Sequence, residues 1–344
     1  MHVAMTSAEA HLAILNIRGI GDIGGSRLIE RFQYLDDFLE APDEAFKGVV
    51  NQTVRNSLRD KDILRGAFDE ALATLRMAEK AGARVLTRFD ADYPRRLTLI
   101  DNSPLILYAQ GDLSTLETSV ACVGTRFPSH YGRVVTSRVA GMLAEEGYCI
   151  VSGLADGVDF ISHRAALDHG GPTVAILGSG LDRINTSDRQ QLAHEILDSG
   201  GGIFTEQPFG FSHDAGSLIR RNRLQSGSSL ATFIMQCGVV SGTMHTLRYA
   251  VTQGRPVFTP IPPDDYAEEE ESAGVLMLAS SKGNQLHERI DIKSSLAEVL
   301  DRDFADRPVA TGFRGRDDYP AVLSELRRLQ VAERAPENLA PSFL

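Results

Sequence analysis

The stretch from Thr118 to Pro262 contains six short apolar runs, rich in β-branched residues, that alternate with segments of helical period. Its successive blocks are SVACVGTRFPSHYG (119–132), CIVSGLADGVD (149–159), TVAILGSGLD (173–182), GIFTEQPFG (202–210), SLIRRNR (217–223), LATFIMQC (230–237), SGTMHTLRYAVTQG (241–254) and PVFTPIP (256–262). This alternation predicts a doubly wound, mostly parallel α/β sheet with right-handed crossovers. Most runs end in Gly, Ser, Thr or Arg, at the carboxyl edge where open α/β sheets bind ligands.

The flanking segments predict a smaller domain before this core and a tail after it. Residues 8–77 have helical period throughout, and AHLAILNIRGIGDIGGSRLIERF (10–32) resembles a helix-hairpin-helix around Gly19-Ile20-Gly21. A tight turn in a small helical bundle is the alternative interpretation, and we favour it. RVLTR (84–88) and LILYAQG (105–111) predict two more strands at the edge of the sheet. We therefore expect a helical domain over 1–78, an extended Rossmann-like domain over 79–300 with its core at 118–262, and a partly ordered tail over 301–344.

Composition and charge narrow the class of protein. The chain has 344 residues, 42% apolar and 24% charged, which is typical of a globular protein. No apolar run reaches the length of a membrane span, and the N-terminus lacks the basic region of a signal peptide, so we expect a cytoplasmic protein without a membrane partner. The net charge of −11 disfavours a general nucleic-acid binder, but residues 208–260 hold five Arg against one acid, Asp214. A local basic face is therefore expected.

No enzyme motif, cofactor motif or metal motif is present. The first strand ends in Gly124-Thr125-Arg126 instead of GxGxxG, which disfavours a dinucleotide, and a GK[ST] loop is missing. Cys122, Cys149 and Cys237 lack ligand spacing and are predicted to be small core residues. Asp159 and His163 are spaced as neighbours on a helix, so we expect a first-turn dipole partner and a helix hydrogen-bonding residue, with no catalytic set.

The strand ends favour anion binding instead. Gly124, Gly153, Gly178 and Gly242 lack a Cβ, so another backbone segment or a phosphate can approach closely. Thr243 begins a helix, whose free N–H groups attract an anion. Arg126 and the run Arg220-Arg221-Asn222-Arg223 add guanidinium groups that can hold phosphates in a bidentate fork. We predict that Arg126, Arg220 and Arg223 line one groove at the sheet edge.

The blocks VGTRFPSHYG (123–132), VSGLADGVDFISHRAAL (151–167), VAILGSGLD (174–182), RRNRLQSGSS (220–229), SGTMHTLRYAVTQGRPVFTPIP (241–262) and KGNQL (282–286) resemble the DNA-processing DprA/Smf family. The resemblance covers about residues 8–300 of the printed sequence. It implies a sterile-alpha-motif-like helical domain, an extended Rossmann domain, and a homodimer that binds single-stranded DNA without catalysis. It also implies delivery of the strand to the RecA recombinase in DNA uptake and homologous recombination.

The resemblance implies a set of DNA- or phosphate-binding residues, with no catalytic residue, cofactor or metal. They are Gly124, Thr125, Arg126, Ser152, Gly153, Leu154, Ala155, Gly157, Gly178, Arg220, Arg221, Asn222, Arg223, Ser241, Gly242 and Thr243. This chain departs from the family pattern at Asp156, where a base is usual, at Leu218, where a stacking Phe is common, and at Gln236, where an acid is common. Both of the first two changes would weaken contacts to a single strand. The winged-helix module often found at the family's C-terminus is not visible in 301–344.

Asp156 has two possible roles that the sequence leaves open. Just past the second strand, its carboxylate could face the same groove as Arg126 and repel a phosphate. Alternatively, it could cap the helix that begins near Gly157 by accepting backbone hydrogen bonds.

An enzyme or nucleotide sensor is the alternative class. Similar Rossmann domains in the cytokinin-activating LOG phosphoribohydrolases carry PGGxGT followed by Glu, whereas this chain has CGVVSGT (237–243) followed by Met244. The carboxylate that would activate a nucleoside bond is missing there, and Glu206 is the spare candidate. Finally, VLMLA (275–279) beside the acidic run 264–271, expected to be a loop, predicts an apolar self-association surface of a homodimer.

Overall fold

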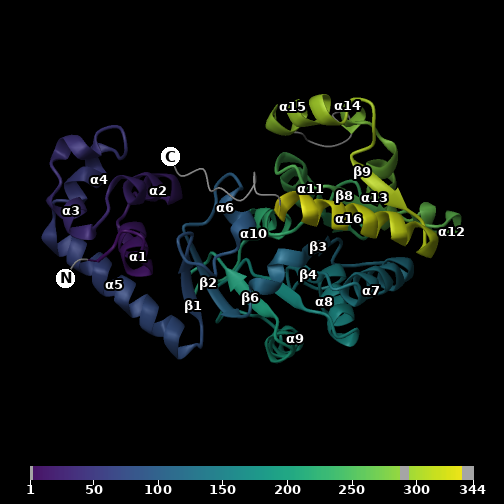
Figure 1. The fold of residues 1–344 in the computed structure, drawn as a ribbon, viewed down its shortest axis with the longest axis horizontal. Coiled ribbons are helices and arrows are strands. Elements are labelled where there is room, and N and C mark those ends of the chain that lie inside the picture. The colour runs from purple at the N-terminus through teal and green to yellow at the C-terminus, as the bar shows by residue number, and fades with distance from the viewer. Residues whose placement is uncertain (1–2, 287–293, 335–344) are drawn as a thin grey trace.

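The computed structural model describes residues 3–286 and 294–334, which form a nine-stranded mixed sheet with helices on both faces (Figure 1). The strand order is β1-β2-β6-β5-β4-β3-β7-β8-β9. The strands are β1 (Arg84–Thr87), β2 (Ile106–Gly111), β3 (Ser119–Val123), β4 (Cys149–Ser152), β5 (Thr173–Ile176), β6 (Gly202–Thr205), β7 (Thr232–Ile234), β8 (Val257–Pro260) and β9 (Ala310–Phe313).

Strands β3 to β9 pair in parallel, and β1 and β2 add to the edge in antiparallel pairing, β2 with β6. The prediction of a doubly wound, mostly parallel sheet with two added edge strands is confirmed. From β3 the chain proceeds outward through β4, β5 and β6, and then returns to the other side of β3 with β7. The order of strands therefore reverses between β3 and β7, which is where open α/β sheets form a ligand crevice.

Alternating side chains of the central strands bury both faces of the sheet. Ile150 of β4 belongs to the core under α7 and α8, whereas Cys149 and Val151 belong to the core on the α10 side. This two-sided burial explains the continuous apolar runs, because a strand covered on both faces has no polar side. The helices and 3₁₀ turns of this part are α6 (Arg95–Thr98), η2 (Ser114–Thr118), α7 (His130–Glu145), α8 (Val158–Asp168), α9 (Ser187–Asp198), α10 (Ala215–Gly227) and α11 (Thr243–Thr252).

The N-terminal residues form a helical layer beside β1 and β2, drawn in purple at one end of the molecule in Figure 1. Its elements are α1 (Ala8–Asn16), α2 (Asp22–Arg31), α3 (Leu35–Glu40), η1 (Asp43–Phe46), α4 (Gln52–Ser57) and α5 (Lys61–Lys80). The cap residue Asp60 accepts hydrogen bonds from the first amides of α5, and Gly82 follows its end with φ +63°. The buried side chains of this layer continue into those of β2, so the helices share a core with the sheet.

Two expectations for the later residues were wrong. The acidic run 264–271 is helical, because it forms α12 (Asp264–Ala267) and begins α13 (Glu270–Ser280). Within VLMLA, Val275, Met277 and Leu278 are buried, so this run is part of the core and offers no association surface. Acidic side chains at the start of α13 complement the positive end of its dipole, which favours a helix over a loop.

Of the residues expected to form a partly ordered tail, 301–334 complete the fold. Figure 1 shows β9 at the edge of the sheet beside β8, and α16 packed across the same end of the domain. The remaining elements are α14 (Gly283–Leu286), α15 (Ser294–Asp303), η3 (Arg316–Asp318) and α16 (Tyr319–Arg334). Glu333 of α16 pairs with Arg96 and Arg255, which ties the last helix to two earlier segments. The last ten residues of the expected tail lie outside the described residues.

His163 lies on α8 and makes a side-chain hydrogen bond, as expected: its Nδ1 lies 2.7 Å from the Thr173 hydroxyl. The structure adds that His163 is fully buried. Burial, with a smaller effect of Arg221, lowers the pKa of His163 from 6.5 to about 3. Between pH 6.5 and about 3, His163 therefore binds a proton in the unfolded chain but not in the folded protein. Stability from this group is lost as pH falls from about 6.5 toward 3.

We predict that lowering the pH from 7.5 to 5 reduces the free energy of unfolding by about 2 kcal/mol through His163, because the unfolded chain binds a proton there and the folded protein does not. Urea denaturation at both pH values checks this, and His163→Gln should show a smaller loss than the wild type. His11, whose pKa burial lowers to about 4, accounts for part of the remaining slope. An identical pH dependence in the variant and the wild type would contradict the prediction.

Candidate nucleic-acid interface

A groove opens at the carboxyl edge of the sheet, where the strand order reverses. It consists of two adjoining cavities of about 500 and 310 Å³, which share Arg126, Ala155 and Leu218. We call this the sheet-edge groove. Its lining includes these expected site residues: Gly124, Thr125, Arg126, Gly153, Leu154, Ala155, Gly178, Arg221, Asn222, Ser241, Gly242 and Thr243. Segments far apart in sequence meet here because all of them follow, or face, the carboxyl ends of parallel strands.

Close backbone packing holds the Arg126 loop at the end of β3. The Thr125 amide donates to Gln236 O at 2.8 Å, and the Val158 amide donates to Thr125 O at 3.1 Å. Gly157 has φ +75°, and a Cβ there would lie 2.5 Å from the Arg126 carbonyl group. Gly157 therefore positions the loop instead of lining the groove. Arg126 is exposed, and within residues 3–286 and 294–334 it forms no ion pair.

The N-terminus of α11 faces the same cavity as Arg126. Gly242 precedes the helix without a side-chain cap, and a Cβ at Gly242 would meet no atom within 4 Å. Ser241 supplies a hydroxyl that accepts from the Thr243 amide at 3.2 Å. Together with the helix dipole and Arg126, this arrangement favours an anion.

The other glycines of the predicted site have a different role. A Cβ at Gly153 would overlap the Arg221 guanidinium, one at Gly124 would lie 2.6 Å from Val158, and one at Gly178 would lie 2.9 Å from Leu218. These three positions are filled by the protein's own side chains. Of the two close partners expected at these glycines, the protein itself is the one seen at all three, and open space for a phosphate lies beside Gly242.

Arg221 is a buried cation beneath the groove floor. Its Nη1 donates to Ile176 O at 2.5 Å, at the end of β5, and its Nε has no partner among the described residues. Burial lowers the pKa of Arg221, although the Asp159 charge opposes this effect. Burial likewise raises the pKa of Asp159, against the attraction of Arg221 and a hydrogen bond from the Gly153 amide. Each charge thus stabilises the other in a poorly solvated place.

Asp156 lines the groove with Arg126, as one of the two interpretations predicted. Its carboxylate pairs with Arg189 at 2.6 Å and 3.2 Å, and the helix α8 has no side-chain cap at Gly157, so the capping role is wrong. Arg189 also lines the groove. The pair offsets much of the repulsion expected from Asp156, because the neighbouring guanidinium neutralises its charge locally.

The expected convergence of all three arginines does not occur. Arg220 and Arg223 lie on the other side of α10, in a separate cleft. Arg223 is 7% exposed and pairs with Glu206, and Ser152 is fully buried with its hydroxyl donating to Cys122 O. Helical period explains the split, since Arg220 and Arg221 are about 100° apart around α10. Arg221 and Asn222 face the groove instead.

The backbone of the groove is strained at two residues that are not glycine. Leu154 has φ +54° and Thr186 has φ +77°, and both line the smaller cavity of the groove. Such left-handed conformations cost about 1–2 kcal/mol each and are concentrated at functional sites. This strain supports the assignment of the groove as a binding site.

Phe127 is a groove residue for which the sequence predicted no role. It follows Arg126, lines the groove and leaves 79% of its surface exposed. A large aromatic ring in water is unfavourable unless it meets a partner. The sequence places this residue in a motif, but it does not show that the ring points outward.

The remaining groups favour no catalytic role. Glu206 is largely buried and pairs with Arg223, and burial raises its pKa. It does not line the cavity that contains Ser241, Gly242 and Thr243. The three cysteines are buried, and burial raises the pKa values of Cys149 and Cys237 to about 12, as expected of core residues. Across the described ranges, no three His, Cys, Asp or Glu side chains gather as a metal site. Within those same ranges, every helix is too short or too polar to span a membrane.

Fold and groove together define a Rossmann-type α/β protein. It has a helical N-terminal layer and an arginine-containing groove where the strand order reverses. The chain belongs to the family described as DNA recombination-mediator protein A, whose sequence model matches residues 84–297. It is 29% identical to the protein Smf of Synechocystis sp., over 96% of this chain and 85% of that protein. With several other curated relatives the alignment spans 54% to 60% of their length.

Two solved structures resemble this one. DNA processing protein A (DprA) from Streptococcus pneumoniae superposes with a TM-score of 0.63 at 22% identity, over 88% of this chain and 99% of that one. DNA processing protein A from Helicobacter pylori, whose structure describes a single-stranded DNA binding mode, superposes with a TM-score of 0.54 at 28% identity. That match covers 71% of this chain and 96% of the other. The expected DprA/Smf family and the Rossmann-like fold are confirmed.

Proposed function

We propose that this protein binds single-stranded DNA in the sheet-edge groove, without chemistry, and delivers the strand to a RecA-type recombinase in the cytoplasm. The observation that carries the proposal is Arg126, an exposed guanidinium opposite the open N-terminus of α11. One arginine and one helix terminus suit the phosphates of a single strand. Phe127 and Leu218 add apolar surface for the bases. The single-strand binding of the Helicobacter pylori relative supports this proposal.

A titration of labelled single-stranded and double-stranded oligonucleotides at two salt concentrations tests the proposal. We expect tighter binding of the single strand, with a salt dependence of about 0.7 per phosphate contact. Equal affinity for the duplex, or no binding of either, would contradict it. Release of free base from nucleoside monophosphates would instead favour the enzyme alternative.

Homodimerisation is also part of the proposal, although the surface first assigned to it is buried. Delivery to a recombinase requires a strand that is first held and then released. In a dimer, two copies of the groove would bind one longer strand together and hold it more tightly by avidity. Light scattering at tens of micromolar distinguishes the dimer from the monomer.

A further inference from the structure

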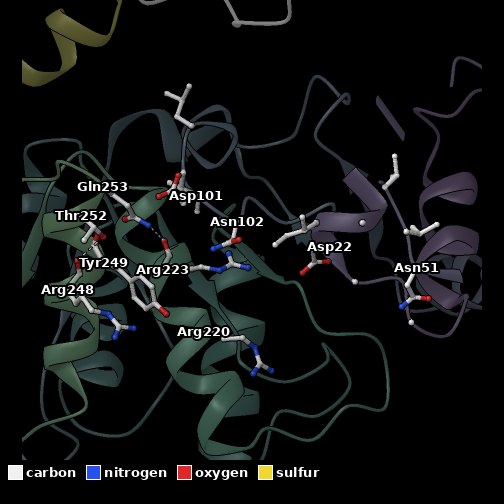
Figure 2. Close-up of a pocket in the computed structure, with 18 residues that line it drawn as sticks. Asp22, Asn51, Asp101, Asn102, Arg220, Arg223, Arg248, Tyr249, Thr252 and Gln253 are labelled. Atoms are coloured by element: carbon white, nitrogen blue, oxygen red, sulfur yellow. Dashed lines mark hydrogen bonds between the residues drawn. The ribbon is translucent and has the colours of Figure 1, made fainter. Parts of the chain in front are cut away.

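A second large cavity lies between the helical layer and α10 and α11. It measures about 940 Å³, at the upper end of the range for ligand pockets, and Figure 2 shows its side chains facing one another across an open space. One wall comes from the turn before α2 and from Asn51, and the other from α10 and α11. We call it the inter-domain cleft.

The α10–α11 wall is cationic. Arg220 is exposed and Arg248 is partly exposed, and neither forms an ion pair in the part of the chain that the structure describes. The Arg248 guanidinium lies 5.0 Å from the centre of the Tyr249 ring, which orients it toward the space seen in Figure 2. Arg223, which is 7% exposed, lines the same wall with an Nη1 that has no hydrogen-bond partner among the described residues.

Exposed apolar side chains and two carboxylates also line the cleft. Ile23 is 62% exposed and Leu99 is 68% exposed, and both line the cleft with Val50. Exposed apolar side chains beside a cationic wall match a nucleotide, which has an anionic phosphate on one side and an apolar base face on the other. Asp22 and Asp101 also line the cleft. These two charges would repel the second row of phosphates in a duplex.

Helix α10 separates this cleft from the sheet-edge groove and contributes side chains to both. Arg221 and Asn222 line the groove, and Arg220 and Arg223 line the cleft. A strand that leaves the groove across α10 therefore meets a second set of cations at once.

We infer that the inter-domain cleft is a second subsite for the same single strand. Arg220 and Arg248 bind its phosphates, and Tyr249, Ile23 and Leu99 contact its bases. This inference rests on the proposed function, because it extends the path of the strand held by Arg126. Ile23 in the first turn of α2 and Leu99 form the apolar part of the subsite, and Asp22 keeps phosphates on the α10–α11 side.

The test compares oligothymidylates of about 6 and about 20 nucleotides, one near the lower end of the roughly 4–16 nucleotides of single-strand sites and one above the upper end. The proteins are the wild-type full chain, Arg126→Ala, Arg248→Gln and Tyr249→Leu. We expect Arg126→Ala to weaken both lengths. Arg248→Gln and Tyr249→Leu should each weaken the 20-mer about tenfold and leave the 6-mer unchanged. For the 20-mer, Arg248→Gln should also lower the salt slope by about 0.7.

Arg65→Gln is the matched control, since Arg65 lies on α5, lines none of the cavities described and has an exposed side chain. It should bind both lengths as the wild type does. Equal effects of Arg248→Gln on the two lengths, or no effect on either, would overturn the second subsite while leaving the groove intact. If the wild type binds neither oligonucleotide, the proposed function fails and the second subsite with it. Melting curves of each variant establish that the fold is retained.

Discussion

Arg221→Leu is expected to lower the free energy of unfolding by about 3 kcal/mol or more. The arginine is 5% exposed and donates to the Ile176 carbonyl oxygen at the end of β5. Leucine fills part of the volume, but it leaves Asp159 as a buried carboxylate without a nearby cation. Urea denaturation at pH 7 measures the change. The slope of the free energy of unfolding against urea concentration should stay the same, because the fold does not change.

Asp159→Asn in the Arg221→Leu background separates lost charge balance from lost packing. The amide carries no charge, so the double variant should be more stable than Arg221→Leu alone, with a coupling of about 1 kcal/mol or more. A double variant that is less stable than either single variant would show that Arg221 acts through packing and its carbonyl bond instead.

Phe127→Ala and Arg126→Ala are expected to cause the largest losses of single-strand affinity. Stacking of a base on an aromatic ring is worth about 1–3 kcal/mol, so loss of Phe127 should weaken binding about tenfold or more. Loss of Arg126 removes a charge-assisted contact of about 1.5–3 kcal/mol and should lower the salt slope by about 0.7. Fluorescence anisotropy at two salt concentrations measures both quantities.

The two variants should differ in a way that identifies each role. Phe127→Ala should leave the salt slope unchanged, because the ring carries no charge, and Phe127→Tyr should restore the affinity. Both side chains are exposed, so the free energy of unfolding should change by no more than about 0.5 kcal/mol. Full affinity in Phe127→Ala would mean that the exposed ring has a different partner.

The sequence by itself determined the sheet, the edge strands and the family. Alternation of apolar runs with helical segments is a local property, and it forced parallel pairing with crossovers. The position of Arg126 at the end of β3 followed from the same pattern, because carboxyl ends of parallel strands share one edge. The core positions of the three cysteines were also predictable from their places in or beside apolar runs.

Predictions from local sequence pattern were wrong where packing against distant segments determines whether a residue is buried. The residues 275–279 have the composition of an association surface, yet they are buried under β8 and β9, which the sequence shows only as separate runs. The segment 310–313 (ATGF) is too short to be predicted as a strand from its sequence. It becomes strand β9 because it pairs with β8.

Only the tertiary structure decided which way the arginines point. Arg220 and Arg221 are adjacent in sequence, but the rotation of α10 against the sheet sends one into the inter-domain cleft and the other beneath the groove. The same packing occupies Gly124 and Gly153 with Val158 and Arg221, and leaves Phe127 in solvent. Residue type fixes what a side chain can bind. The packing of helices on the sheet fixes whether a ligand or the protein itself takes that place.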